Sequence, residues 1–163
     1  MGHPKKQRKK YDSPMKPYDK SRLEREKAVK DNFGIRRKKE IWRAESILRN
    51  FRQRARALQA NRNEKDEAIL LETMRNIGIK CDNLENVLEV SLDDILSRRL
   101  QTIVHKKGFA GTMKQSRQFV VHGHVMVGGR KVMHPSYIVS GDEYDNITMD
   151  QKMKLKNEEK KDA

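Results

Sequence analysis

Two histidines separated by one glycine, His122 and His124, are the first candidates for chemistry, in the segment RQFVVHGHVMVGGRKVMHPSYIV at residues 117–139. Tetrahedral zinc requires four ligands, or three ligands and a water molecule. The segment has no cysteine and no nearby acidic side chain to complete such a set. It also lacks the glycine-flanked nucleophile turn of a hydrolase. We therefore predict no metal site, no catalytic residue and no cofactor here.

The pattern around the two histidines changes from helix to strand. His122 ends a predicted helix, and from His124 apolar and other residues alternate as in a strand. The pair Gly128-Gly129 supplies the positive backbone angles of a tight hairpin turn. The return strand is predicted at 130–132 and a third strand at 137–139. His122 and His124 are then polar caps of these elements, or imidazoles that stack on or hydrogen-bond to RNA, and the two interpretations are compatible.

The charge of the chain indicates a polyanionic partner. Its 163 residues include 37 Lys and Arg against 23 Asp and Glu, a formal net charge of +14, and only 35% are hydrophobic. Residues 1–60 hold 20 basic and 7 acidic side chains, and residues 91–140 hold 8 and 2. Such an excess repels itself unless counter-charges arrive, which favours binding to nucleic acid or to an acidic membrane surface.

Several classes of protein are disfavoured by the same composition. No apolar run approaches the roughly 20 residues of a membrane-spanning helix, and the first residues lack the apolar stretch of a secretory signal. A lone Cys81 excludes an internal disulfide framework and a Cys-rich zinc site. We expect an intracellular, soluble protein that binds a polyanion.

The N-terminal part reads as a basic arm followed by helices. Residues 1–18 contain KKQRKK without apolar periodicity, which predicts either a disordered tail or an arm that becomes ordered between phosphates. The spacing of Ser21 and Glu24 is that of a capping box. It predicts a helix from about Arg22 to Phe33, closed by Gly34 as a left-handed cap.

The best helical pattern runs from Lys38 to Ala60. One apolar stripe recurs at steps of three and four residues, through Ile41, Ala44, Leu48, Phe51, Ala55 and Leu58. The other faces carry more arginine than lysine, which suits two-pronged contacts to phosphate. A shorter acidic helix is predicted at 64–77, with its outer face toward solvent or a basic neighbouring protein. Cys81 is expected as a small residue in a polar loop.

The late part of the chain reads as a small unit of two helices and a sheet. Ser91 and Asp94 begin a predicted helix that continues to about Lys107, with Arg98, Arg99, Lys106 and Lys107 on its outside. Thr112 and Gln115 open a second helix that ends near His122. Together with the hairpin, these elements make a compact unit of about 50–60 residues.

At this point the residues match a known family. The run LDDILSRRLQTIVHKKGFAGTMKQSRQFVVHGHVMVGGRKVMHPSYIVSGD resembles the small RNA-binding module named after ribosomal protein S-four of the small subunit. The shared features are RRLQT, the KKGFA turn, RQFVVHGHV, the glycine hairpin and PSY. The arm MGHPKKQRKKY and the helix GIRRKKEIWRAESILRNFRQRARAL look like the archaeal and eukaryotic branch of that family. The similarity covers nearly all of residues 1–145, and the cysteines of the zinc-bearing bacterial branch are missing.

This resemblance implies a structural RNA-binding protein of the cytoplasmic ribosome, with no catalysis. Members nucleate folding of the five-prime domain of small-subunit ribosomal RNA and line the region where the messenger RNA enters, with an influence on translational accuracy. They touch neighbouring ribosomal proteins, including the S-five family; no homo-oligomer is expected. Two rival interpretations are a transient ribosome assembly or rescue factor, and the RNA-targeting part of an RNA-modifying enzyme.

The fold class expected is α+β, a helical N-terminal part plus a small RNA-binding module of two helices and a short antiparallel sheet. Four regions are predicted: a basic arm (1–18), a helical RNA-binding region (19–90), the S-four-type module (91–145) and a charged tail (146–163) that is a loose helix or disordered. The residues expected to face RNA in the N-terminal part are Lys5, Lys6, Arg8, Lys9, Lys10, Arg36, Arg37, Lys38, Lys39, Arg43, Arg49, Arg52, Arg54 and Arg56. Those expected in the module are Arg98, Arg99, Lys106, Lys107, Lys114, Gln115, Arg117, Gln118, His122, His124, Arg130, Lys131 and His134.

Overall fold

The computed structural model describes residues 2, 3 and 8–150, and within these it contains seven helices and three strands. The helices are α1 (Lys20–Asn32), α2 (Lys38–Ala60), α3 (Glu64–Ile77), α4 (Leu84–Glu89), α5 (Leu92–Ser97), α6 (Leu100–Lys106) and α7 (Met113–Val121). The strands are β1 (Val125–Val127), β2 (Arg130–Lys131) and β3 (Ile147–Met149). None of the helices in the described part has the length and apolar composition needed to cross a membrane.

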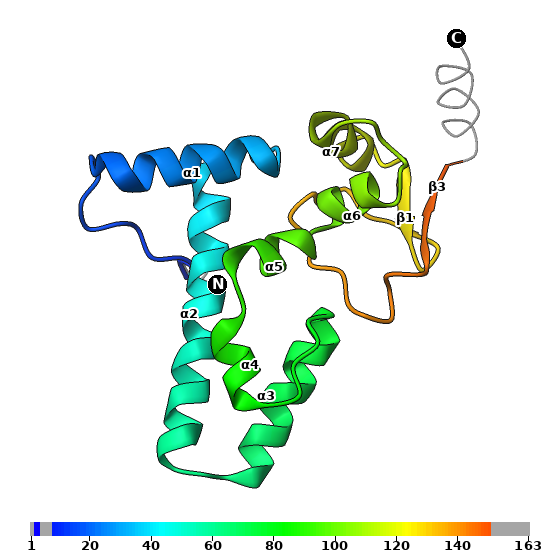
Figure 1. Cartoon of the computed structure of the whole chain (residues 1–163). Coiled ribbons are helices and arrows are strands. Elements are labelled where there is room, and N and C mark those ends of the chain that lie inside the picture. The colour runs from blue at the N-terminus through cyan, green and yellow to red at the C-terminus, as the bar shows by residue number, and fades with distance from the viewer. Residues whose placement is uncertain (1, 4–7, 151–163) are drawn as a thin grey trace.

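The long helix α2 organises the helical part of the molecule. In Figure 1, α1 crosses one end of α2, α3 and α4 lie beside the other end, and α5 leads to a separate unit of α6, α7 and the sheet. This arrangement confirms the expected α+β fold. The bounds of α2 and α3 are those that the apolar periodicity predicts.

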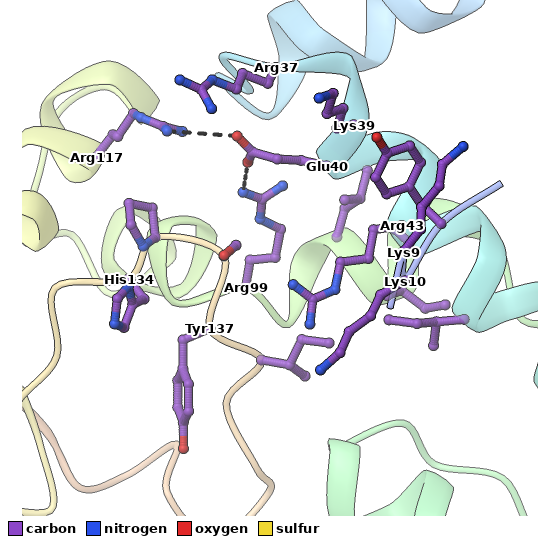
Figure 2. Close-up of a pocket in the computed structure, with 18 of the residues that line it drawn as sticks. Lys9, Lys10, Arg37, Lys39, Glu40, Arg43, Arg99, Arg117, His134 and Tyr137 are labelled. Atoms are coloured by element: carbon purple, nitrogen blue, oxygen red, sulfur yellow. Dashed lines mark hydrogen bonds and ion pairs between the residues drawn. The ribbon is translucent and has the colours of Figure 1, made fainter. Parts of the chain in front are cut away.

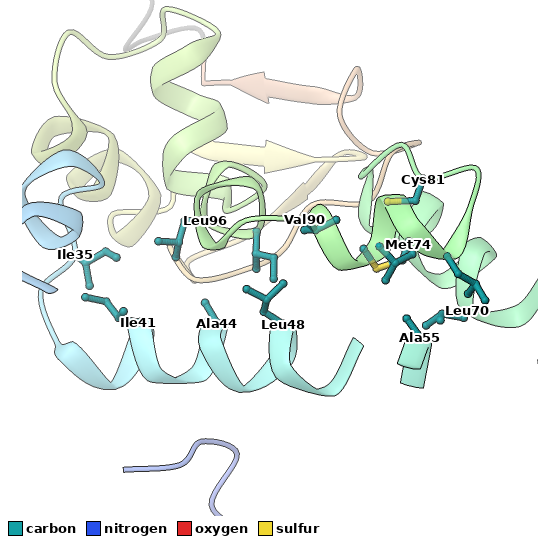
Figure 3. Close-up of a cluster of buried hydrophobic side chains, with 13 residues drawn as sticks. Ile35, Ile41, Ala44, Leu48, Ala55, Leu70, Met74, Cys81, Val90 and Leu96 are labelled. Carbon is teal, nitrogen blue, oxygen red and sulfur yellow. The ribbon is translucent and has the colours of Figure 1, made fainter. Parts of the chain in front are cut away.

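A first hydrophobic core lies along the apolar stripe of α2. Ile41, Ala44, Leu48 and Ala55 are buried and pack against side chains of α3, α4 and α5 (Figure 3). Cys81 belongs to this core, with 1% of its surface exposed. Cys81 lies in the loop before α4, as expected, but this loop turns its small side chain inward. Burial raises the pKa of the Cys81 thiol.

A second core lies between α6, α7 and a three-stranded antiparallel sheet in the order β2-β1-β3. Val125 and Val127 alternate inward on the central strand β1, as predicted. Gly128 and Gly129 both have positive φ and form the hairpin turn to β2. The third strand is not the predicted 137–139 but β3 at 147–149, which pairs with β1 on its other side. Residues 147–149 of the predicted tail therefore belong to the sheet, and its residues 151–163 lie outside the described part of the chain.

The single helix predicted from 92 to 107 is broken into α5 and α6. Arg99 lies between them in an extended conformation and forms an isolated bridge with Ile138. The amide of Leu100 donates to the carbonyl of Tyr137, and that of Val139 donates to the carbonyl of Arg98. These two hydrogen bonds take the place of hydrogen bonds within a continuous helix. The segment at 137–139, predicted as a third strand, therefore pairs with the chain between α5 and α6 instead.

The N-caps predicted for α5 and α7 are observed, and the one predicted for α1 is not. Ser91 and Asp94 form the reciprocal capping box that their spacing predicts. The hydroxyl of Thr112 caps α7 by accepting from the amide of Gln115. The cap predicted at Ser21 is wrong, because Asp19 caps α1 two residues earlier by accepting from the amide of Ser21.

A buried carboxylate joins α1 to α2. Glu26 is 3% exposed and accepts hydrogen bonds from Trp42 Nε1 at 2.9 Å and Arg22 Nη1 at 2.7 Å. The Nζ of Lys38 lies 3.0 Å from its other oxygen. Burial by itself raises the pKa of Glu26, but the hydrogen bond from Trp42 and the partners Lys38 and Arg22 outweigh it and hold the pKa below its usual value.

This shift predicts a pH-dependent stability. Because the pKa of Glu26 is lower in the folded state, its carboxylate stabilises the fold above the unfolded pKa of about 4.3, and this contribution is lost as the pH falls through the folded pKa. Glu26→Gln should lower the free energy of unfolding at pH 7 by about 1–3 kcal/mol and by less at pH 3.5. Denaturant unfolding at the two pH values measures this, with Glu24→Gln on the exposed face of α1 as the control; an equal loss at both pH values contradicts it.

Alanine substitutions at two glycines with positive φ, Gly34 between α1 and α2 and Gly108 after α6, should differ in their cost to stability. Gly34 has φ +58°, and a Cβ there would lie 2.9 Å from Met113 Cβ and 3.0 Å from Gln101 Nε2. Gly108 has φ +74° but open space around it. Gly108→Ala should cost about 1–2 kcal/mol for the left-handed backbone, and Gly34→Ala about 1–3 kcal/mol more because it crowds the contact between the helical part and the module. Thermal unfolding compares them; equal losses would mean that this contact yields without cost.

Candidate nucleic-acid interface

A basic groove of about 1340 Å³ lies between the N-terminal arm, α2 and the module. We call this the basic groove throughout, and Figure 2 shows its side chains converging from the three segments. One acidic residue, Glu40, is among the described residues that line it. The cationic side chains that line it are Arg8, Lys9, Lys10, Arg37, Lys39, Arg43, Arg99 and Arg117, and His134 lines it as well.

The arm forms one wall because it is anchored on α2. The ring of Tyr11 lies 5.9 Å from that of Trp42. The amide of Asp12 donates to Ser46 Oγ at 3.1 Å, and Arg49 Nη1 pairs with the Asp12 carboxylate at 2.7 Å. These contacts hold the described end of the arm against the helix. They leave three cationic side chains exposed: Arg8, Lys9 and Lys10.

The start of α2 forms the second wall. Arg37 precedes the helix, and Lys39 and Arg43 follow four residues apart on one of its faces, where all three are exposed. This spacing places their charges side by side along the groove. Between them Glu40 turns toward the module, where Arg99 Nη2 donates to one of its oxygens and Arg117 Nη2 lies 3.7 Å from the other (Figure 2).

The module supplies the third wall through the loop at 134–139. Tyr137 donates its hydroxyl proton to the Glu143 carboxylate at 2.9 Å, and the amide of Ser140 donates to the same carboxylate at 3.1 Å. Burial alone raises the pKa of Glu143, but these hydrogen bonds hold it below its usual value. The hydrogen bond to Glu143 in turn raises the pKa of Tyr137. The loop is therefore tied back to its own module, with His134 exposed beside the groove.

A second basic surface lies on another face of α2. A shallow hollow of about 480 Å³ is lined there by Arg49, Arg52 and Arg56, with Glu45 beside them. Burial raises the pKa of Glu45. Arg52 is half-buried and donates to the carbonyl of Val90 at 2.8 Å, which ties α2 to the segment before α5. Arg54 and Arg36 are exposed elsewhere on the helical part.

The exposed face of α7 and the hairpin carry further predicted residues. Lys114, Gln118 and His122 recur at four-residue steps and are exposed. The rings of His122 and His124 are stacked, with centroids 6.3 Å apart, and His124 packs edge-on against Phe119. The described residues hold no group of three or more His, Cys, Asp or Glu side chains able to bind a metal. Also exposed are Lys106, Arg130 and Lys131.

Arg98 and Arg99 do not stand on the outside of a helix, as the sequence predicted. Arg99 is 5% exposed, and its guanidinium group faces Glu40. Arg98 donates to the carbonyl of Ile77 at 2.9 Å and to those of two residues of the loop at 137–144, each at 3.2 Å. The prediction failed because the helix breaks here, which turns both side chains toward the helical part.

Other predicted residues also have partners inside the protein. Lys107 donates to the carbonyl of Tyr144 and lies over its ring at 4.6 Å. Lys38 pairs with Glu26, and Gln115 accepts from the amide of Gly111 at 2.9 Å. These side chains therefore make contacts that stabilise the fold. Lys5 and Lys6 lie outside the described residues.

Two residues that shape this surface were not predicted from the sequence. Tyr11 and Glu40 were not singled out, although one anchors the arm and the other binds two arginines. An aromatic residue at the end of a basic run is a usable signal for an anchor. A glutamate within the run RRKKE has no comparable signal, because its partners lie about 60 and 77 residues away in the chain.

Comparisons with known proteins agree with the resemblance found in the sequence. A family model described as S4 domain matches residues 98–143. Relatives named small ribosomal subunit protein uS4 come from the archaea Methanothermobacter thermautotrophicus, Hyperthermus butylicus and Ignicoccus hospitalis, and are 43%, 45% and 44% identical over 152 residues. The matches cover 90% of this chain and 89%, 86% and 92% of the respective relatives. With this identity along nearly the whole length, the chain belongs to the uS4 family of small ribosomal subunit proteins.

Proposed function

We propose that the protein binds small-subunit ribosomal RNA directly, with the basic groove as its principal site. The observation that carries this proposal is the convergence of eight lysine and arginine side chains from three separate segments on one open groove, six of them exposed on the arm and at the start of α2. Cationic side chains that neutralise phosphates release condensed counterions, and this release drives binding. A groove with walls from distant segments suits RNA at a junction better than a straight duplex.

The mode of recognition that fits this surface is shape rather than sequence. The chain is 6% aromatic. Two tyrosines are among the described residues that line the groove, and each has a partner within the protein: Tyr11 packs against Trp42, and Tyr137 is hydrogen-bonded to Glu143. Arginine and lysine contacts to phosphate position RNA without reading bases, and minor-groove and 2′-hydroxyl contacts recognise folded RNA by its form. The exposed face of α7 and the hairpin extend this surface on the module.

The cellular role that we propose follows from the family. By binding the five-prime domain of the ribosomal RNA, the protein would nucleate assembly of the small subunit, contribute to the region where the messenger enters and influence accuracy. Neighbouring ribosomal proteins, including the S-five family, would contact its protein-facing surfaces. The acidic outer face of α3 is one such candidate for a basic neighbour.

Binding should weaken steeply with salt. If about five to eight phosphates are neutralised, the logarithm of the association constant should fall linearly with the logarithm of the salt concentration, with a slope of about −4 to −7. Filter binding of the full chain to a five-prime-domain fragment of archaeal small-subunit ribosomal RNA, between 50 mM and 400 mM KCl, measures the slope. A slope near zero contradicts phosphate neutralisation as the driving force.

Basic side chains in the groove and at the break between α5 and α6 should differ in what their substitution affects. The double variant Lys39→Ala, Arg43→Ala should weaken RNA binding about tenfold or more and leave the melting temperature nearly unchanged, because both side chains are exposed. Arg98→Ala should instead lower the free energy of unfolding by about 2–3 kcal/mol, because three carbonyls lose their donor.

The matched control for the groove variant is Arg62→Ala, Lys65→Ala. It removes the same charge from the turn between α2 and α3 and the start of α3, outside the groove. Binding isotherms and thermal unfolding of all three variants make the comparison. Equal losses of affinity in the groove and control variants would show that net charge alone, rather than this groove, holds the RNA.

A further inference from the structure

The basic groove contains a carboxylate that works against phosphate binding. Glu40 is the one acidic residue among the described residues that line it. A negative charge between Lys39 and Arg43 repels phosphate and lowers the positive potential of the groove. A glutamate in the first turn of a helix favours the helix dipole, but that role does not require its side chain to contact the module.

The contacts of Glu40 cross from the helical part to the module. Its two carboxylate oxygens face Arg99, between α5 and α6, and Arg117, in the middle of α7. The Arg99 side chain is 6% exposed, that of Glu40 19% and that of Arg117 27%. Of the ion pairs between described side chains, these two alone join α2 to the module.

The remaining contacts at this junction hold the two parts together but give Arg99 and Arg117 no second carboxylate among the described side chains, since the other partner of Arg117 is the neutral Gln101 Oε1 at 3.5 Å. Gln101 Nε2 donates to the carbonyls of Phe33 and Gly34 at 3.3 and 3.2 Å, and Arg98 donates to the carbonyl of Ile77. These acceptors are neutral. Without Glu40, Arg99 and Arg117 would face Arg37 and Arg43 across the groove as like charges, which disfavours the closed arrangement of the walls.

We propose that Glu40 is a specificity-determining residue, which fixes the module against α2 so that the basic groove has one shape and selects folded RNA over other polyanions. The inference rests on the proposed RNA binding and assigns Glu40 a positioning role within it. A buried ion pair adds little net stability, and its best-attested use is to fix a unique arrangement. The cost of one negative charge in the groove is offset by a geometry that only RNA of matching shape can fill.

The test compares affinities of the full-length variants for two probes, the folded five-prime-domain fragment and single-stranded poly(U) of equal length. Glu40→Gln should weaken binding to the folded fragment about tenfold, because the coupling across the groove is lost. It should strengthen binding to poly(U) about twofold, because the groove gains one positive charge. An effect of charge alone would raise both affinities. A fall in affinity for the folded fragment with a rise for poly(U) therefore distinguishes a positioning role of Glu40 from a charge effect.

Two further variants separate position from charge. Glu40→Asp keeps the charge and the first-turn position but shortens the side chain, so it should weaken binding to the folded fragment and leave poly(U) binding unchanged. Glu45→Gln makes the same charge change on another face of α2, beside Arg49 and Arg52, and should raise both affinities equally. If Glu40→Gln fails to fold, Glu40→Asp carries the test, and an unchanged affinity for folded RNA there overturns the inference.

The geometry itself can be measured without RNA. Spin labels on Gln59→Cys, in the last turn of α2, and on the exposed Met133→Cys report the distance between the two parts, while Cys81 is buried and escapes labelling. The distance distribution should be narrow in the parent protein and clearly broader with Glu40→Gln. Glu45→Gln should leave it narrow.

The possible outcomes assign failure to one proposal or the other. If the parent protein binds folded RNA no better than poly(U), the proposed function fails, and this inference with it. If the parent discriminates and Glu40→Gln discriminates equally, with an unchanged distance distribution, the role of Glu40 is refuted and RNA binding stands. Loss of discrimination together with a broader distribution supports the inference.

Discussion

The whole structure depends on a polar junction between two hydrophobic cores. One core follows the stripe of α2, and the other lies between α6, α7 and the sheet. The chain passes from one to the other at Arg98 and Arg99, where the helix is interrupted and the backbone pairs with Ile138. Hydrogen bonds from Arg98 and Gln101 to main-chain carbonyls span this point. Directional polar bonds fix an orientation that apolar packing alone would leave adjustable.

The junction divides the basic residues of the protein into two groups, those that are exposed and those that bind other parts of the fold. Lys39 and Arg43 in the groove are exposed. Arg98 and Arg99 instead bind a main-chain carbonyl and a carboxylate of the helical part. Arginine serves both purposes because its planar guanidinium group can satisfy several acceptors at once and stays charged when partly buried. The count of basic residues therefore overstates the positively charged surface that is exposed.

Local patterns in the sequence were enough for most of the secondary structure. The stripe from Ile41 to Leu58 predicted α2 at its true bounds, and Gly128-Gly129 predicted the hairpin. Both signals are local, since a helix face repeats every three to four residues and a tight turn needs positive φ at adjacent positions. The family resemblance was likewise readable from runs of contiguous residues, and the comparisons confirm it.

The sequence by itself determined the apolar stripe of α2, the glycine hairpin, the family and the large excess of positive charge, because these depend on periodicity, motif and composition. Only the tertiary structure decided which arginines are buried, that β3 rather than 137–139 completes the sheet, and that Glu40 meets Arg99 and Arg117. The physical reason is the same in each case. A contact between residues far apart in the chain can override a local preference for helix or strand, because it satisfies backbone or charged groups. The two residues of such a contact are tens of positions apart, so no short-range spacing in the sequence predicts it.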